Sequence, residues 1–200
     1  MEVRYVTDRY DTLCAKYRQD YKDNPAYLYC GVADMDLAPP KQILDAMKRR
    51  LDHGVFGYTE LPDEYEKLIA GWMKEQYHCE AEPEWVLFSP RINMALNMAV
   101  DTFTEPGDSI IVNTPAYPAL TGAVEKWGRI LKESPLIFEG GRFTIDFDGL
   151  ERLADQGTRA YILCNPHNPT GRVWEEEELS GIISFCRRHD LLLLSDDIHG

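Results

Sequence analysis

Two adjacent carboxylates, Asp196 and Asp197, follow the apolar run LLLL at residues 191–194 and Ser195. Such a run is typical of a buried β-strand. A carboxylate at the end of a buried strand loses hydration free energy unless a cation or several hydrogen-bond donors meet it. A permanently protonated ring nitrogen would meet this need. The acid pair therefore marks a place where the chain could bind a positively charged group of a ligand.

A second polar segment is the loop NPHNPTG, residues 165–171. Each X-Pro step favours extended backbone before the proline, and Gly171 permits the turn out of the loop. The side chain of Asn168 is therefore held on a stiff loop, where it could contact a ligand. A tight connection between a strand and a helix, without any ligand, explains the loop equally well.

Two further segments could contribute to the same site. SPRIN at residues 89–93 opens a predicted helix, whose first backbone N–H groups could bind an anion, as those of any helix can. TPAYPA at residues 114–119 carries Tyr117, whose ring could stack on a flat ligand. Packing in the core is the more ordinary role of such a tyrosine. Each of these two signals is weak by itself.

The elements that must position these segments alternate along the chain. The predicted strands are 85–88, 109–113, 129–131, 159–164 and 191–195, and the predicted helices between them are 91–104, 116–127, 147–155 and 175–189. This alternation favours parallel pairing, and continuous apolar strands are typical of a sheet covered on both faces. In such a sheet, ligands bind outside the carboxyl ends of the strands. We therefore expect an α/β fold with a mainly parallel sheet flanked by helices.

The first part of the chain has a different character. Residues 1–30 are rich in tyrosine, and residues 31–40 are punctuated by glycine and proline. Helices are predicted over 41–53 and 62–77. We interpret residues 1–40 as an arm rather than as an independent domain, and residues 41–200 as part of one large domain.

The composition excludes several classes of partner. The chain has 21 Lys and Arg against 34 Asp and Glu, a net charge of -13 that disfavours nucleic acid and anionic membranes. Its apolar runs are too short to span a bilayer, and its first residues lack the apolar core of a signal peptide, so we expect a cytoplasmic protein. The five cysteines lack CxxC spacing, so neither a disulfide framework nor a metal site is indicated.

Taken together and in this order, these segments resemble the fold-type I pyridoxal-phosphate enzymes, the aspartate aminotransferase superfamily of class I and II. The resemblance implies that Asn168 binds the phenolic oxygen of pyridoxal 5'-phosphate. It implies that Asp196 pairs with the protonated pyridine nitrogen and that Tyr117 stacks on the ring. The resemblance also places His199 at the position where many relatives have a tyrosine near the same phenolic oxygen.

The resemblance also implies a phosphate-binding turn at residues 90–92, which includes Arg91 and Ile92. Relatives usually carry a glycine where this chain has Arg91. The arginine could add a contact to the phosphate or point into solvent, and the sequence favours neither arrangement.

More narrowly, the chain resembles the cystathionine β-lyase-like branch of carbon–sulfur lyases in three segments, namely GVADMDLAPP at 31–40, HGVFGYTELPDEY at 53–65 and SDDIH at 195–199. The resemblance implies a homodimer with active sites at the interface, in which Tyr58 of the partner subunit reaches the phosphate. It also places Ala33 and Asp34 beside the substrate, although acids in irregular loops are often only turn formers.

The Schiff-base lysine of this family follows the strand that carries Asp196. None of the lysines from Lys16 to Lys132 stands at that position. We therefore expect the lysine beyond residue 200, together with the rest of the large domain and a C-terminal small domain.

The resemblance implies a pyridoxal-phosphate-dependent C–S β-lyase that cleaves cystathionine or a cysteine conjugate to a thiol, pyruvate and ammonia. An aminotransferase would use the same contacts, and a substrate without a leaving group would reveal it. A truncated, non-catalytic or regulatory protein with the same fold is the alternative of another class.

Overall fold

The computed structural model describes residues 37–200, which form two units that we treat separately. The first unit ends at Tyr65, and the second runs from Glu66 to Gly200. In the first unit, helix α1 (Lys41–His53) is followed by Gly54, whose φ of 73° is the left-handed conformation that glycine adopts at least cost. The helix predicted over 41–53 is confirmed. The proposed boundary at residue 40 stays a prediction.

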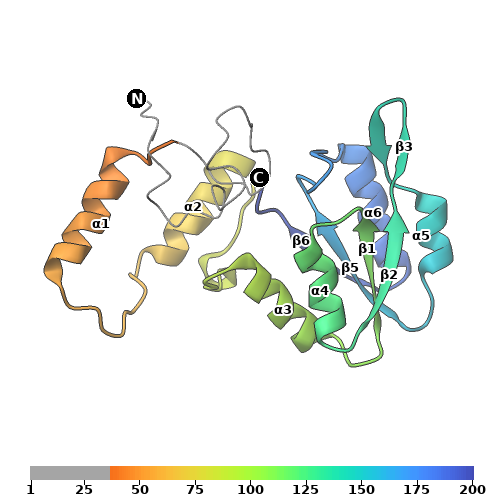
Figure 1. Cartoon of the computed structure of the whole chain (residues 1–200), viewed down its shortest axis with the longest axis horizontal. Coiled ribbons are helices and arrows are strands. Elements are labelled where there is room, and N and C mark those ends of the chain that lie inside the picture. Colours follow the sequence, from red (N-terminus) through yellow and green to blue (C-terminus); the bar gives the residue numbers. More distant parts are fainter. Residues whose placement is uncertain (1–36) are drawn as a thin grey trace, which may run out of the picture. The chain divides into compact units, whose positions relative to one another are not determined.

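A four-stranded parallel sheet forms the centre of the second unit (Figure 1). Its order is β2-β1-β5-β6, with bounds Ile130–Pro135, Ser109–Thr114, Thr158–Cys164 and Leu192–Asp196. Parallel neighbours require crossover connections, which the helices between the strands supply. The predicted α/β fold class is therefore confirmed.

Helices cover both faces of this sheet, as Figure 1 shows. They are α3 (Ile92–Phe103) and α4 (Pro118–Lys126) on one face, and α5 (Phe147–Leu153) and α6 (Glu176–Arg188) on the other. Neighbouring residues of β1 alternate between the two cores: Ile110 and Val112 pack with α3 and α4, and Ile111 packs with α5 and α6. Each such buried aliphatic side chain contributes about 1.5–3 kcal/mol. The two inner strands are thereby fixed from both sides.

The strand predicted over 85–88 is wrong. Residues Pro83–Trp85 form a short 3₁₀ helix, η2, and residues 86–88 adopt no regular structure. A strand requires a hydrogen-bonded neighbour, and among residues 37–200 the sheet places none beside this segment. An apolar run shows that its side chains prefer to be buried, but it does not show whether a neighbouring strand is present to pair with.

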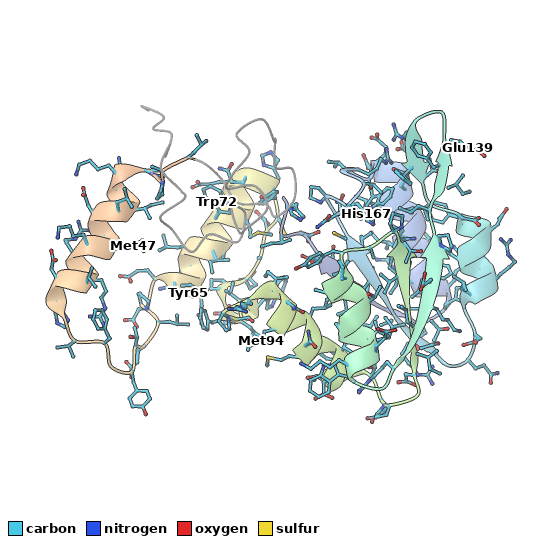
Figure 2. All side chains as sticks on the ribbon, viewed as in Figure 1. Met47, Tyr65, Trp72, Met94, Glu139 and His167 are labelled. Carbon is cyan, nitrogen blue, oxygen red and sulfur yellow. The ribbon has the colours of Figure 1, made fainter. Side chains whose placement is uncertain are left out.

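A β-hairpin is present that the sequence analysis did not predict. It consists of β3 (Ile137–Glu139) and β4 (Arg142–Thr144), joined by Gly140 and Gly141 with φ values of 59° and 79°. A Gly-Gly pair is a common hairpin turn because both residues take positive φ freely. The hairpin projects beyond the end of β2, and Figure 2 places Glu139 near its tip.

The helix α2 (Tyr65–Tyr77) matches the prediction over 62–77 except in its first turn.

A buried arginine closes the carboxyl end of α3. The side chain of Arg129 is 3% exposed, and its guanidinium donates to the hydroxyl and the carbonyl of Thr104 and to the carbonyl of Trp127. These carbonyls end or follow a helix and lack intrahelical partners. Arg129 therefore satisfies backbone acceptors at the point where the chain passes from α3 toward β2.

We expect Arg129→Met to destabilise the protein by about 3 kcal/mol, because it leaves buried acceptors without donors. The measurement is the urea midpoint of unfolding at constant slope. Arg159→Met is the matched control, because the Arg159 side chain is 53% exposed, and we expect it to change stability by no more than about 0.5 kcal/mol. Equal midpoints for the two variants would contradict this role of Arg129.

Candidate functional site

The carboxyl ends of β5 and β6 lie side by side. In the parallel register, Cys164 at the end of β5 stands opposite Asp196 at the end of β6. β1, on the other side of β5, ends at Thr114 in the same direction. The segments that follow these three strands therefore share one edge of the sheet, as the sequence analysis expected. We call this edge the rim.

The loop 165–171 is joined to both of its neighbours. The backbone N–H of Asn165 donates to the carbonyl of Asp196 over 3.0 Å, and its side-chain oxygen accepts from the N–H of Trp174 over 3.1 Å. The indole N–H of Trp174 donates in turn to the carbonyl of Cys164 over 2.9 Å. The peptide bonds before Pro166 and Pro169 are cis. The loop is thus tied to β6 and to the segment that leads into α6.

His167 lies inside this loop and is a residue that the sequence analysis did not single out. It is labelled in Figure 2 and is 3% exposed. Its Nδ1 is 2.8 Å from the hydroxyl of Thr170, and its ring centroid is 5.3 Å from that of Trp174. Burial lowers the pKa of His167 below its ordinary value of 6.5. The imidazole is therefore an internal support of the loop. The sequence shows a histidine between two Asn-Pro steps, which could have drawn attention to this residue. The sequence does not show that the histidine is buried.

Asn168 is half-buried on the same loop. Its backbone N–H is hydrogen-bonded to the thiol of Cys164. Within residues 37–200 its side-chain amide has no hydrogen-bond partner. This amide is therefore able to donate to a ligand and to accept from one.

Asp196 is half-buried rather than deeply buried, which corrects the expectation of a buried strand. β6 is an outer strand of the described sheet, and its first residue, Leu192, is 37% exposed. One carboxylate oxygen of Asp196 accepts from the N–H of Ile198 over 3.2 Å. The other has no partner among the described residues. The carboxylate is thus held in place by one donor and keeps an oxygen for another.

Asp197 and His199, which follow β6, are both exposed. Asp197 accepts from the hydroxyl of Ser195 over 2.8 Å. His199 has an exposed side chain without a hydrogen-bond partner among residues 37–200. Its predicted place beside a phenolic oxygen stays a prediction.

The amino end of α3 has no side-chain cap. Arg91 is the N-cap, and its carbonyl accepts from the hydroxyl of Ser89 over 2.9 Å and from the backbone of Met94 and Ala95. Ile92 begins the helix and is 44% exposed. No side chain of the described residues accepts from the first N–H groups of α3, so an anion could bind them. The exposed side chain of Arg91 remains compatible with a phosphate contact or with solvent.

Tyr117 is the N-cap of α4 and directly precedes its first residue, Pro118. Its side chain is 48% exposed, so the ordinary role of such a tyrosine in the core does not hold here. The residue stands in the segment after β1, and its ring is accessible for stacking.

The remaining predicted residues lie outside the second unit. Tyr58 belongs to the first unit, where its side chain is fully exposed. Its contact with a phosphate in a neighbouring subunit stays a prediction. Ala33 and Asp34 lie outside the described residues.

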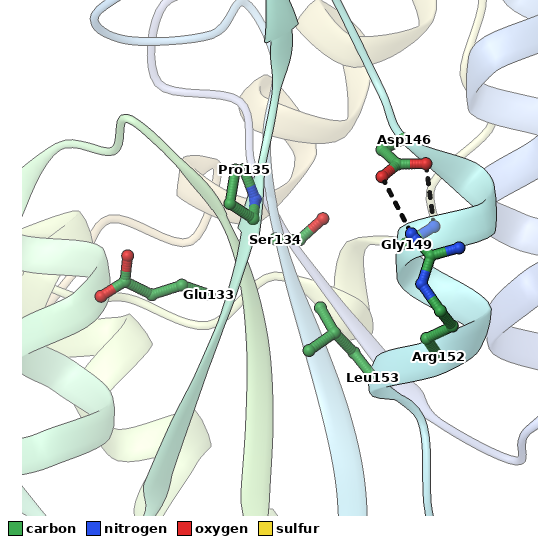
Figure 3. Close-up of a pocket in the computed structure, with 7 residues that line it drawn as sticks. All are labelled: Glu133, Ser134, Pro135, Asp146, Gly149, Arg152 and Leu153. Atoms are coloured by element: carbon green, nitrogen blue, oxygen red, sulfur yellow. Dashed lines mark hydrogen bonds and ion pairs between the residues drawn. The ribbon is translucent and has the colours of Figure 1, made fainter.

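A pocket of about 210 Å³ lies elsewhere, between β2 and α5 (Figure 3). It is lined by Glu133, Ser134, Pro135, Asp146, Gly149, Arg152 and Leu153. None of the predicted cofactor residues lines it. It is also smaller than the pockets of about 300–1,000 Å³ that usually hold small molecules. Asp146 points back to the N–H of Gly149 and to Arg152, so its carboxylate is already engaged (Figure 3).

Among residues 37–200 no three acidic, histidine or cysteine side chains are grouped so that they could hold a metal ion. No helix in this range has the length and apolarity to cross a bilayer.

The amino acid sequence matches the family model of aminotransferase class I and II over residues 28–200. The chain belongs to the aminotransferase class I and II family. It is 44% identical over 169 residues to cystathionine beta-lyase PatB of Bacillus subtilis, a match that covers 84% of this chain and 44% of PatB. It is 31% identical over 173 residues to an aspartate aminotransferase of Pyrococcus abyssi, covering 84% of this chain and 44% of that protein.

The fold of this aminotransferase-family chain is shared with solved structures. Cystalysin from Treponema denticola, whose crystal structure contains a pyridoxal 5'-phosphate cofactor, superposes with a TM-score of 0.89 at 34% identity. The match covers 99% of this chain and 52% of cystalysin. The chain thus spans about half the length of the relatives that it matches.

The lowered pKa of His167 predicts a dependence of stability on pH. The unfolded state takes up a proton at an ordinary histidine pKa of about 6.5, whereas folded His167 takes it up only at a lower pH. The quantity to follow is the difference in free energy of unfolding between wild type and His167→Phe. This difference should be constant above about pH 6.5 and should decrease as the pH falls from there through the lower pKa of folded His167. Urea unfolding of both proteins at several pH values measures this difference. A difference independent of pH would exclude a buried, neutral His167.

Proposed function

We propose that this chain binds pyridoxal 5'-phosphate at the rim and that the protein is a C–S β-lyase acting on cystathionine or a related cysteine conjugate. The observation that carries the proposal is the pairing of β5 with β6. It sets Cys164, at the end of β5, opposite Asp196 and brings the loop that carries Asn168 to the same edge of the sheet. Among residues 37–200, the Asn168 amide and one oxygen of the Asp196 carboxylate have no hydrogen-bond partner. An amide and a carboxylate are the groups that a phenolic oxygen and a protonated pyridine nitrogen require.

The donors and acceptors at the rim fit this cofactor group by group. Asp196 would hold the proton on the pyridine nitrogen through a charge-assisted hydrogen bond. Asn168 would donate to the phenolic oxygen, and the accessible ring of Tyr117 would stack on the pyridine face. The uncapped amino end of α3, at Arg91 and Ile92, would bind the phosphate. When bound, pyridoxal phosphate supplies an electron sink for the negative charge that develops at the substrate α-carbon.

Asp196 performs the main electronic task among these residues. A carboxylate that stays ionised beside the ring nitrogen favours the protonated, positively charged ring. The hydrogen bond from the N–H of Ile198 fixes the direction of the Asp196 carboxylate. Among residues 37–200 its other oxygen has no partner and would accept from the ring. His199, two residues beyond Asp197, would lie near the phenolic oxygen.

The assembly and location of the protein are part of the same proposal. We infer a homodimer in which Tyr58 of the partner subunit contacts the phosphate. Ala33 and Asp34 would stand on the substrate side, and residues 41–200 would belong to the large domain. We also propose that the protein is cytoplasmic, as the sequence analysis expects.

Turnover assays distinguish the lyase from the alternative activity. We expect cystathionine to give pyruvate, ammonia and a thiol in equal amounts. The similarity to an aspartate aminotransferase favours transamination as the second candidate. If the holoenzyme transaminates aspartate with a keto acid but releases no pyruvate from cystathionine, the protein is an aminotransferase and the proposed lyase activity is wrong.

Asp196→Ala should lower lyase turnover about 100-fold or more, because the loss of a hydrogen bond between charged groups costs about 1.5–3 kcal/mol and the ring loses its proton as well. The rate of pyruvate release measures the effect. Asp197→Ala is the matched control, since it removes an exposed carboxylate one residue away, and it should retain turnover. Unchanged turnover of Asp196→Ala would exclude the pyridine contact.

Tyr58→Phe should weaken cofactor retention about 10-fold, because it removes one hydroxyl donor to a charged phosphate. The dissociation constant for pyridoxal phosphate, from equilibrium dialysis, measures it. Thr59→Val, at the next residue, serves as the control. Equal retention by Tyr58→Phe and wild type would argue against the phosphate contact.

A further inference from the structure

The peptide bond between His167 and Asn168 is held at both of its polar atoms. The carbonyl of His167 accepts from the N–H of Gly171 over 2.8 Å, and the N–H of Asn168 is bonded to the thiol of Cys164. Because a peptide group is planar, two hydrogen bonds at its opposite sides fix the orientation of the whole plane. The backbone of Asn168 is restricted again on its other side by Pro169. The position from which the Asn168 side chain projects is therefore set by its surroundings.

Cys164 supports this peptide from the end of β5. It is 4% exposed, and its thiol donates to the carbonyl of Pro166 over 3.3 Å while it accepts from Asn168. Burial raises the pKa of Cys164, and the carboxylates of Asp196 and Asp197 raise it further. The sulfur therefore stays a neutral thiol, which is the form that donates and accepts at once.

His167 supports the same peptide from inside the loop. Its backbone N–H donates to the carbonyl of Arg172 over 2.6 Å. Its imidazole Nδ1 is hydrogen-bonded to the hydroxyl of Thr170 over 2.8 Å. The ring lies against Trp174, which is itself anchored to the carbonyl of Cys164. The contacts that hold Asn168 in place, directly from Cys164 and from His167 through Trp174, thus both lead to Cys164, the last residue of β5.

We propose that Cys164 and His167 are positioning residues, which hold the amide of Asn168 at the place from which it binds the phenolic oxygen of the cofactor. This inference rests on the proposed function, because it assigns a purpose to the Asn168 amide. Neither residue touches the cofactor in this proposal. A group held in place before binding avoids the entropy cost of ordering it during binding, so affinity is lost when the support is removed.

The test compares two pairs of matched variants of the holoenzyme. Cys164→Ala is compared with Cys186→Ala, because both cysteines are 4% exposed but Cys186 packs in the core of the opposite face. His167→Ala is compared with His189→Ala, because each imidazole lies against an aromatic ring, at 5.3 Å from Trp174 and 4.8 Å from Phe185. The measurements are the dissociation constant for pyridoxal phosphate and the pH midpoint of the absorbance change of the bound cofactor.

We expect Cys164→Ala and His167→Ala to raise the dissociation constant about 3- to 10-fold, the scale of one lost hydrogen bond. The pH midpoints of their absorbance change should shift in the same direction as that of Asn168→Ala. Cys164→Ser should show a smaller shift than Cys164→Ala. Cys186→Ala and His189→Ala should lower the melting temperature without changing either cofactor measurement. Equal cofactor effects in the controls would show that only general stability was lost and would overturn the proposal.

The double variant Cys164→Ala/Asn168→Ala separates this inference from the proposed function. If Cys164 acts through Asn168, the double variant should bind the cofactor no more weakly than Asn168→Ala alone. Fully additive losses would contradict the positioning role while leaving the cofactor contact intact. An Asn168→Ala variant with unchanged affinity and spectrum would remove the cofactor contact itself, and the positioning role with it.

Discussion

The pairing of β5 with β6 is the interaction on which the candidate site depends. It sets Cys164 opposite Asp196, and the hydrogen bond from Asn165 to the carbonyl of Asp196 continues the pairing past the last residue of β5. β5 is buried on both faces between helices, so its position is fixed by the whole core. The less buried β6 takes its position from β5, and the carboxylate of Asp196 follows.

Much of this arrangement could be predicted because it is local. Continuous apolar runs located β1 and β5, and acids and bases at opposite ends of residues 175–189 located α6. Asn168 and Asp196 were found because polar residues after parallel strands fall on one edge. The family resemblance, confirmed over residues 28–200, then implied a chemical role for each of the two residues.

What could not be predicted depends on contacts distant in the sequence. The apolar residues 85–88 form no strand, since pairing is decided by a neighbour that a local pattern does not report. Tyr117 is accessible rather than buried because it caps α4 at the end of the sheet. Cys164 and His167 look ordinary in sequence, and only their burial against the loop gives them a structural purpose.

A crystal structure of the holoenzyme with pyridoxal phosphate tests the central claim most directly. The account predicts the pyridine nitrogen within hydrogen-bond distance of Asp196, the phenolic oxygen within reach of the Asn168 amide, and the ring against Tyr117. The backbone around Asn168 should superpose on the arrangement described here, because its supports are already in place. A cofactor bound away from the ends of β5 and β6, or a loop 165–171 rebuilt around it, would contradict the account.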